Sequence, residues 1–591
     1  MQKLTIAVIV FFTIIVGGFF LAPLSCGAPQ DRRAVQPEPE IRINDATGDL
    51  TVKYMAPVAL SVGLDPGQFS GQMADWWLTA QTPFGVFSWR YPDGWSQGVT
   101  PLQLPLMDVS PFTVWDGPLC EGEYVFRFGV DDNADGSQEM TWNQALSLTV
   151  CPESHNESLF ESGNIGAVTA PTPLLRQLQL RDDNDDCSLP QTWRSWWYVR
   201  LTDLVADTPV TIDLTGRGWP YYYVPVYSLD EETWQRMAED EVSQPGTYEL
   251  HMEKNFFQQR VSLARFYPYT YTRLIDYLTG IVTDPNIHIE VIGDTESGRP
   301  MPMVTITDDS VDDATKKRVW LHARTHPAET GPSFLLEGLI NFLLGGSGAA
   351  KLALSGLIFN IVPMQNIDGV VAGNYRTTPS TRNLEVAWYR EPENPRLLTA
   401  EAPVEVVALH ETILRLLRQG PEFTVAINLH ASNSEPDVRP FFFPHFGSRA
   451  QGYAANETAL WDRQIDFIGQ LSRFYGVEMI EPIPEEGGAS FVAKSYPESW
   501  WWANFQETVM AITLETTYGR AGYAPRWITP DDLRTLGEAV AKALMAFNGL
   551  ETEEMADRQV LTETTLRRKT KAISLKYPDL YPPLMADEGK E

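Results

Sequence analysis

Between residues 276 and 550, short apolar runs alternate with longer segments in which apolar positions recur at helical spacing. The apolar runs are typical of buried strands, and they predict strands at 319–324, 356–364, 423–430 and 508–516. The segments between and after them predict helices at 333–344, 402–418, 458–475 and 530–548. Thr529 as N-cap, Pro530 at the first helical position and Gly549 just past the end support the last helix. The alternation predicts an α/β/α domain with a mixed central sheet.

Two regions before residue 276 have a different pattern. In residues 46–155, aromatic and β-branched residues alternate between clusters of Gly, Pro and Asp, which predicts an all-β sandwich domain. Residues 156–275 are also rich in strand-forming sequence, and we interpret their alternating tryptophans and tyrosines as core residues rather than a ligand platform. The chain is therefore predicted to be multidomain, with two β domains before the α/β/α domain.

The run DDNADG in the first β domain has the spacing of a calcium loop. Asp131, Asn133, Asp135 and Gly136 occupy the expected places, but the twelfth position is Trp142 instead of glutamate. We interpret the run as a turn between two strands, with weak calcium binding as the alternative.

The N-terminus is apolar from Leu4 to Leu24, with Lys3 as the only charge before that run. This is typical of an export signal or an N-terminal anchor. We therefore divide the rest of the chain into a leader at 1–26, a linker at 27–45 and a charged tail at 551–591. Cys26 is a candidate lipoprotein acceptor, although Pro23 replaces the expected leucine, so a cleaved signal stays open. The expected location is the periplasm or the cell surface, with membrane contact only through the leader or a lipid at Cys26.

The net charge and the cysteine content limit the partners and the metal sites that the chain can have. The 45 Lys and Arg residues against 77 Asp and Glu residues leave a net charge of −32, which argues against nucleic-acid binding through a basic patch. The four cysteines form no CxxC pair, which excludes a cysteine-rich zinc site. Cys120 and Cys151 both lie beside predicted strands, and we predict a disulfide between them.

The first candidate functional residues lie in the run VWLHARTHPAETGPSFLLEG. A predicted strand ends there in a turn that carries His326 and, three residues later, Glu329, before the next helix. With eight histidines in the chain, an HxxE pair is expected by chance about half the time, so a surface turn is the alternative.

Three further polar residues follow other strands of the same domain. His430 ends one predicted strand, Glu515 ends another, and Arg376 follows a third. Sites in open α/β sheets form beyond the carboxyl ends of strands, so these side chains are expected to converge. Two histidines and one glutamate are the ligand set of a catalytic zinc, and they would be His326, Glu329 and His430. Glu515 is then the candidate general base, and Arg376 a candidate partner for a developing oxyanion.

These residues, in this order, resemble the zinc metallocarboxypeptidases of the carboxypeptidase A clan, and specifically their cytosolic carboxypeptidase branch. The resemblance covers about residues 160–550 and includes the runs ESGNIGAV, FYPYTYTRLIDYL, ARTHPAETGPSF, IVPMQNIDGVVAGNYR and ITLETTYG. It implies one zinc ion on His326, Glu329 and His430, with Glu515 as general base and acid and Arg376 polarising the carbonyl. It also implies a structural turn at Asn366, Asp368 and Gly369.

One departure from that pattern concerns the substrate's C-terminus. The family continues after GNYR to an Asp-Leu-Asn-Arg run, and this chain has Asn383, Leu384, Glu385 and Val386 instead. The missing asparagine and arginine grip a terminal carboxylate, and a hydrogen bond to a charged group is worth about 1.5–3 kcal/mol. We expect Glu385 to repel a free carboxylate and to favour a cationic or neutral group.

The function predicted from the sequence is an exported zinc metallopeptidase that cleaves a peptide or peptide-like amide bond, with altered recognition of the C-terminal carboxylate. Glu385, Arg382 and Tyr518 are the candidate substrate-binding residues, and Arg390 and Arg439 are further candidates for meeting the carboxylate. The alternatives are a conventional C-terminal exopeptidase and a catalytically silent ligand-binding protein of the same fold.

Overall fold

The computed structural model describes residues 36–52, 56–83, 85–92, 94–119, 122–150, 160–484, 487 and 494–556. The chain divides into two compact units, Met1–Leu50 with Ala56–Thr149, and Thr51–Met55 with Val150–Glu591. The predicted leader, Cys26 and the Cys120–Cys151 pair all lie outside the described residues. Cys187 is disulfide-bonded.

The first unit contains two β-sheets. The strands of the smaller sheet are β1 (Glu38–Ile43), β3 (Val58–Asp65) and β8 (Val109–Gly117). The larger sheet has the order β2 (Leu50–Val52), β10 (Trp142–Val150), β9 (Gly122–Val130), β4 (Met73–Thr82), β5 (Gly85–Arg90) and β6 (Gly94–Gln97), with β7 (Leu102–Pro105) paired to β4. Strand β1 begins inside the segment 27–45 that we predicted to be a linker, because it pairs along its whole length with β3.

The DDNADG run connects β9 to β10, as predicted for a turn. Asp131 is buried there, and its carboxylate accepts hydrogen bonds from the backbone N–H of Asp75 at 2.8 Å and from the Trp77 indole at 3.1 Å. The first carboxylate of the calcium-like spacing is therefore occupied by structural hydrogen bonds.

The second unit begins with two further sheets. One has the order β11 (Ala167–Thr172), β12 (Leu175–Gln179), β14 (Thr208–Thr215), β18 (Leu250–Phe256) and β17 (Val242–Ser243). The other has the order β13 (Tyr198–Leu201), β19 (Val261–Ala264), β15 (Val226–Ser228) and β16 (Trp234–Arg236). Trp196, Trp197 and Tyr198 are buried, as the core interpretation of these aromatic residues predicts.

The rest of the second unit is an α/β domain built on a seven-stranded mixed sheet. Its order is β20 (Ile287–Asp294), β21 (Pro300–Ile306), β23 (Leu357–Val362), β22 (Lys317–Ala323), β24 (Phe423–Ser432), β26 (Met510–Thr517) and β25 (Phe441–Phe443). The four central strands β23, β22, β24 and β26 are parallel, and they are the four strands that we predicted. A small hairpin, β27 (Arg520–Ala521) with β28 (Arg526–Trp527), follows β26.

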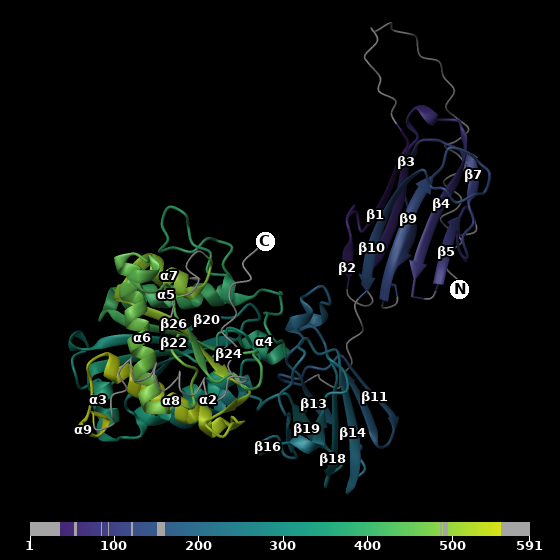
Figure 1. The fold of residues 1–591 in the computed structure, drawn as a ribbon. Coiled ribbons are helices and arrows are strands. Elements are labelled where there is room, and N and C mark those ends of the chain that lie inside the picture. Colours follow the sequence, from purple (N-terminus) through teal and green to yellow (C-terminus); the bar gives the residue numbers. More distant parts are fainter. Residues whose placement is uncertain are drawn as a thin grey trace. The chain divides into compact units, whose positions relative to one another are not determined.

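Helices cover the sheet, with α2 and α8 below it and α5 and α7 above it in Figure 1. The four predicted helices are α2 (Gly331–Leu344), α5 (Val404–Gln419), α6 (Ala455–Tyr475) and α8 (Pro530–Phe547). The remaining helices are α1 (Tyr271–Ile281), α3 (Gly348–Gly356), α4 (Ile367–Ala372), α7 (Pro497–Phe505) and α9 (Glu553–Ala556). No single helix in the described ranges is both long and apolar enough to span a bilayer, and only the sharply bent pair α2–α3 passes that test by length and composition.

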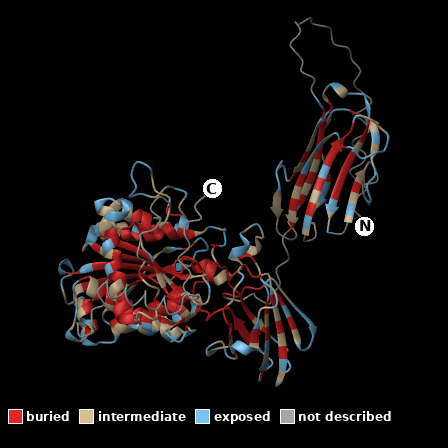
Figure 2. Ribbon diagram, in the orientation of Figure 1, coloured by how far each residue is buried: buried red, intermediate tan, exposed pale blue. Residues whose placement is uncertain are grey.

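The central strands form the core of the domain, which Figure 2 shows as a continuous buried layer. Every residue of β23 is buried, and β22 is buried from Arg318 onward. Strands covered by helices on both faces carry apolar residues at nearly every position, which is why these runs do not alternate.

Leu321, fully buried in the middle of β22, tests this packing. Leu321→Ala removes apolar contacts and leaves a cavity, so it should lower the free energy of unfolding by about 2–5 kcal/mol. Denaturant unfolding measures this value. Val291→Ala on β20, where the side chain is exposed, is the control, and it should change stability by no more than about 0.5 kcal/mol.

Candidate metal centre

The turn after β22 is held in shape by a buried arginine. Arg324 has a left-handed backbone (φ +59°), and its guanidinium donates to the carbonyl of Pro327 at 2.9 Å and to the carbonyl of Tyr269 at 2.9 Å. Gly331 starts α2 directly behind the turn, where an added Cβ would lie 2.4 Å from the Thr516 hydroxyl. The chain therefore turns sharply enough to direct His326 and Glu329 back over the sheet.

The predicted structural turn after β23 supports the same region. Asn366 caps α4 by accepting a hydrogen bond from Gly369 N–H at 3.0 Å, and its side-chain amide donates to the carbonyl of Thr325 at 3.3 Å. Asp368 forms an ion pair with Arg299 at 2.6 Å. Thr325, the residue directly before His326, is therefore hydrogen-bonded to the turn that follows the neighbouring strand β23.

His326, Glu329 and His430 form a tight triangle at the carboxyl ends of β22 and β24. Nδ1 of His326 lies 2.9 Å from one Glu329 oxygen, Nδ1 of His430 lies 2.8 Å from the other, and the two Nδ1 atoms are 3.2 Å apart. All three side chains are buried. Ligand atoms bound about 2.0 Å from a tetrahedral zinc are themselves roughly 3.3 Å apart, so the spacing fits such an ion.

A second carboxylate, Glu385, belongs to the same cluster. It lies in the short 3₁₀ turn Leu384–Val386, and one of its oxygens is 3.0 Å from Nε2 of His430. His326, Glu385 and His430 form a buried His-Glu-His group whose potential ligand atoms all lie within 4.8 Å of one another. Two carboxylates thus contact His430, Glu329 from its Nδ1 side and Glu385 from its Nε2 side.

The cluster holds more negative charge than its histidines can balance. Burial alone would raise the pKa of Glu329, but the charges and hydrogen bonds of His326 and His430 hold that pKa far below its usual range. Burial would likewise lower the pKa of His430, yet Glu385 and Glu329 keep it well above its usual value. Buried carboxylates that depend on imidazole protons for compensation are the surroundings that a divalent cation stabilises.

Glu515 stands beside His430 in register, because β24 and β26 are parallel neighbours. Its side chain is half-buried, and its Oε2 atom has no hydrogen-bond partner among the described residues. Burial raises the pKa of Glu515 to about 8, with Glu329 and Glu385 adding to the effect and His430 and Arg376 opposing it. A carboxylate in this position can take up and release a proton next to the cluster.

Arg376 is positioned from the N-terminal part of the second unit. Asp183, in the 3₁₀ turn Asp183–Asp185, accepts the backbone N–H groups of Tyr375, Arg376 and Thr377 at 2.6, 2.8 and 2.9 Å. Burial lowers the pKa of Arg376, but Tyr375 and the carboxylates of Glu329, Glu385 and Glu515 together raise it above its ordinary value. The guanidinium therefore stays charged within the field of the three glutamates.

Arg376→Ala should lower kcat about 10²–10³-fold without changing the zinc content, because it removes a donor for developing negative charge. Steady-state kinetics with metal analysis measures both quantities. Arg415→Ala, which removes a partly exposed arginine of α5 that pairs with Glu290, is the control. An unchanged kcat in Arg376→Ala would contradict the assigned role.

Comparison with known proteins fits this geometry. Residues 274–396 match the family described as zinc carboxypeptidase, and residues 157–266 match the cytosolic carboxypeptidase N-terminal domain. The chain belongs to the zinc carboxypeptidase family, in its cytosolic carboxypeptidase branch. Its buried cluster of two histidines and glutamate carboxylates provides the kind of ligand set that a zinc ion needs.

Individual relatives agree with this family membership. Cytosolic carboxypeptidase 3 of Mus musculus is 30% identical over 254 residues, which cover 39% of this chain and 25% of that protein. Cytosolic carboxypeptidase 2 of Homo sapiens is 30% identical over 258 residues, covering 39% of this chain and 28% of that protein. A putative carboxypeptidase A from Shewanella denitrificans has a solved structure with 25% identity and a TM-score of 0.54, covering 66% of this chain and 98% of that one. The match to the two curated relatives spans only about a quarter of their length.

The expectation of an exported, membrane-held carboxypeptidase is contradicted. The matching N-terminal domain is that of cytosolic carboxypeptidases, and both curated relatives above are named as cytosolic enzymes. An apolar N-terminal run followed by a cysteine resembles an export signal by composition alone, so composition was a weaker guide here than the domain that follows.

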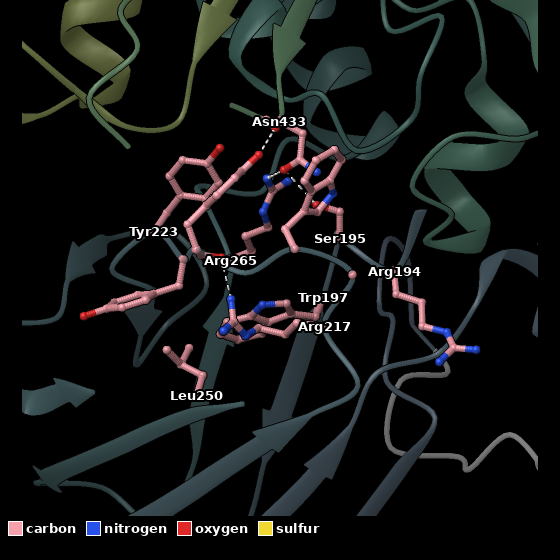
Figure 3. Close-up of a pocket in the computed structure, with 12 residues that line it drawn as sticks. Arg194, Ser195, Trp197, Arg217, Tyr223, Leu250, Arg265 and Asn433 are labelled. Atoms are coloured by element: carbon pink, nitrogen blue, oxygen red, sulfur yellow. Dashed lines mark hydrogen bonds between the residues drawn. The ribbon is translucent and has the colours of Figure 1, made fainter. Parts of the chain in front are cut away.

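The N-terminal part of the second unit also supports the loop after His430. Figure 3 shows Ser195, Arg265 and Tyr223 converging on Asn433 and the segment around it, beside a small pocket. Ser195 Oγ donates to the Asn433 side chain at 3.0 Å, and Arg265 donates to the same oxygen. The Tyr223 hydroxyl donates to the carbonyl of Ser434. The loop that continues from the metal-binding strand is thus bonded to the domain that also fixes Arg376.

Two predicted substrate-binding residues lie elsewhere. Tyr518 is fully buried, its hydroxyl contacts the carbonyl of Ala328 at 3.4 Å, and Arg265 stacks on its ring, so it packs under the metal-binding turn and does not reach substrate. Arg382 is exposed and donates to the carbonyl of Glu401 at 2.9 Å. Among the further candidates, Arg390 donates to the Ser499 carbonyl and Arg439 pairs with Glu481.

Three residues near the cluster escaped sequence reasoning. Asn383 lies 3.2 Å from Nε2 of His326 through its side-chain oxygen, and Asn428, two residues before His430, donates to both oxygens of Glu385. Tyr496, the half-buried N-cap of α7, has a pKa raised by burial and by Glu385. The period-2 rule could have found Asn428, because residues two apart on a strand share a face. Tyr496 precedes a helix instead of following a strand, so a search for polar residues at strand ends does not find it.

Proposed function

We propose that this protein is a zinc-dependent carboxypeptidase that removes residues from the C-terminus of a peptide. The observation that carries the proposal is the buried triangle of His326, Glu329 and His430, with Glu515 in register beside it. Membership of the zinc carboxypeptidase family supports the same reaction. We assign Glu329 as the carboxylate ligand of the zinc, and the 2.8–2.9 Å contacts with both Nδ1 atoms support that assignment.

The chemistry follows from the positions of three groups. The two histidines and Glu329 would hold a zinc ion, which would supply Lewis-acid chemistry toward a bound water and the substrate carbonyl. Glu515 takes the proton of the attacking water and delivers it to the leaving amine. Arg376 stabilises the negative charge that develops on the carbonyl oxygen. Asp183 holds the backbone of Arg376 in place for this task.

Recognition of the terminal carboxylate is proposed to be weaker than an asparagine-arginine pair would make it. Val386 stands where the family pattern has arginine, and the Glu385 carboxylate is turned toward His430 and Asn428. Arg382, Arg390 and Arg439 are all engaged with other groups. Among these arginines in the described residues, Arg376 remains as the charged donor near the cluster, and its main proposed role is in the reaction.

Matched peptides with free and amidated C-termini test this proposal. We expect zinc-dependent release of the C-terminal residue from the free peptide, with kcat/KM exceeding that of the amidated peptide by less than about tenfold. Val386→Arg should raise this preference for the free peptide at least about tenfold further, because one charge-assisted hydrogen bond is worth about 1.5–3 kcal/mol. Failure to cleave either peptide would overturn the proposed activity. A wild-type preference above a hundredfold would instead overturn the proposed weak carboxylate recognition.

A further inference from the structure

The short turn Leu384–Val386 and the residue before it lie behind both zinc-site histidines. Oε2 of Glu385 is 3.0 Å from Nε2 of His430, and the Asn383 side-chain oxygen is 3.2 Å from Nε2 of His326. The same Asn383 oxygen accepts the backbone N–H of Glu385 at 3.1 Å. One turn therefore places an amide behind the first imidazole and a carboxylate behind the second.

The two nitrogens of each imidazole face different groups. The Nδ1 atoms of His326 and His430 face each other and Glu329, while both Nε2 atoms point away from that triangle. An imidazole that binds a metal through one nitrogen keeps a proton on the other, and the acceptor of that proton fixes the tautomer and the ring orientation. Since the triangle uses Nδ1, the groups that face the Nε2 atoms are the Asn383 side-chain oxygen at His326 and the Glu385 carboxylate at His430. The second contact, at 3.0 Å, is an ion pair without hydrogen-bond geometry.

Glu385 is itself held in this position. Asn428 donates to its two oxygens at 3.3 and 3.2 Å, and Asn428 lies on β24 two residues before His430. The side chain is only 10% exposed, so little of it is open to solvent. These contacts account for the charge at position 385 without reference to the substrate.

We propose that Glu385 is a positioning residue, whose carboxylate pairs with the Nε2 side of the His430 ring and thereby holds its Nδ1 toward the metal. Glu329 is then the carboxylate that binds the metal itself. The inference rests on the proposed zinc site, and it assigns position 385 to support of the metal ligand instead of recognition of the substrate's end.

Zinc affinity of the full chain, measured by competition with a chelator, tests the assignment. Glu385→Gln should weaken zinc binding about 10–100-fold, the range found when an outer partner of a metal ligand is lost. Glu385→Asp, which keeps the charge, should recover part of that loss. Glu329→Gln should weaken binding more than Glu385→Gln does, because it removes a ligand. Glu498→Gln is the matched control, since Glu498 is also a buried glutamate near Glu385 but bonds to Thr513, and it should leave affinity unchanged.

Two results would overturn the proposal. If Glu385→Gln loses zinc as completely as His430→Ala while Glu329→Gln retains it, Glu385 is a ligand. If zinc affinity is unchanged in Glu385→Gln and only KM for free C-termini shifts, Glu385 reads the substrate. Thermal unfolding of each metal-free variant separates these results from a folding defect, and Glu385→Asp carries the test if the glutamine variant fails to fold. Absence of peptidase activity in the wild type would remove the proposed function but leave the affinity order intact.

Discussion

Glu515→Gln should lower kcat about 10²–10⁴-fold while the protein keeps its zinc. The carboxylate stands in register with His430 on the adjacent strand, and its Oε2 atom has no hydrogen-bond partner in the described part of the chain. Glutamine preserves the size of the side chain but cannot accept and return a proton. Peptide hydrolysis and metal content are measured on the same sample.

The control for Glu515→Gln is Glu405→Gln. Glu405 is also a buried glutamate whose pKa is raised by burial, but it lies at the start of α5 and accepts the backbone N–H of Glu296. Its replacement should leave kcat unchanged. Full activity in Glu515→Gln would contradict the assignment of the general base.

His430→Ala should abolish both zinc binding and hydrolysis, with a loss of affinity beyond the 10–100-fold range expected for an outer partner. It removes one of the two imidazoles of the 2.8–3.2 Å triangle, and with it the cationic partner that Glu329 and Glu385 each contact, at 2.8 and 3.0 Å. Metal titration followed by mass spectrometry measures the loss.

The control for this variant is His410→Ala. His410 is another buried histidine. It lies on α5, away from the cluster, and its Nε2 atom is 2.7 Å from the carbonyl of Arg396. Zinc stoichiometry should be unaffected there. Retention of zinc by His430→Ala at wild-type affinity would show that the metal lies elsewhere.

The central strands of the α/β domain could be predicted because each is marked by a local run of apolar residues. The apolar runs that form β22, β23, β24 and β26 are buried on both faces, and the structure places each within about three residues of the predicted bounds. The convergence of His326, His430 and Glu515 followed from parallel strands that end at one edge of a sheet.

The direction of the Glu385 side chain was beyond such reasoning. Its position in the family pattern indicated a group facing the substrate, and its charge indicated repulsion of a carboxylate. The structure turns it toward Asn428 and His430, which lie more than 40 residues later in the chain. Charge at a position is readable from sequence, but the partner that orients it depends on a strand brought alongside by folding.

Contacts between residues far apart in the sequence could not be predicted either. Asp183 bonds to backbone groups about 190 residues away, and nothing in its local sequence indicates that it positions Arg376. Tyr518 follows Glu515 closely enough to suggest a shared site, yet it continues past the strand end into the core. Strand β1 was assigned to a linker because six residues with an internal proline carry little strand signal without their partner β3.

The central claim is that the cluster around His326 and His430 holds one zinc ion. The most direct test is elemental analysis of the purified full-length chain, with the His326→Ala variant measured beside it. The predicted result is one zinc per wild-type chain and none in the variant. A wild-type chain that binds no zinc when the metal is supplied, or a variant that keeps a full equivalent, would contradict the claim.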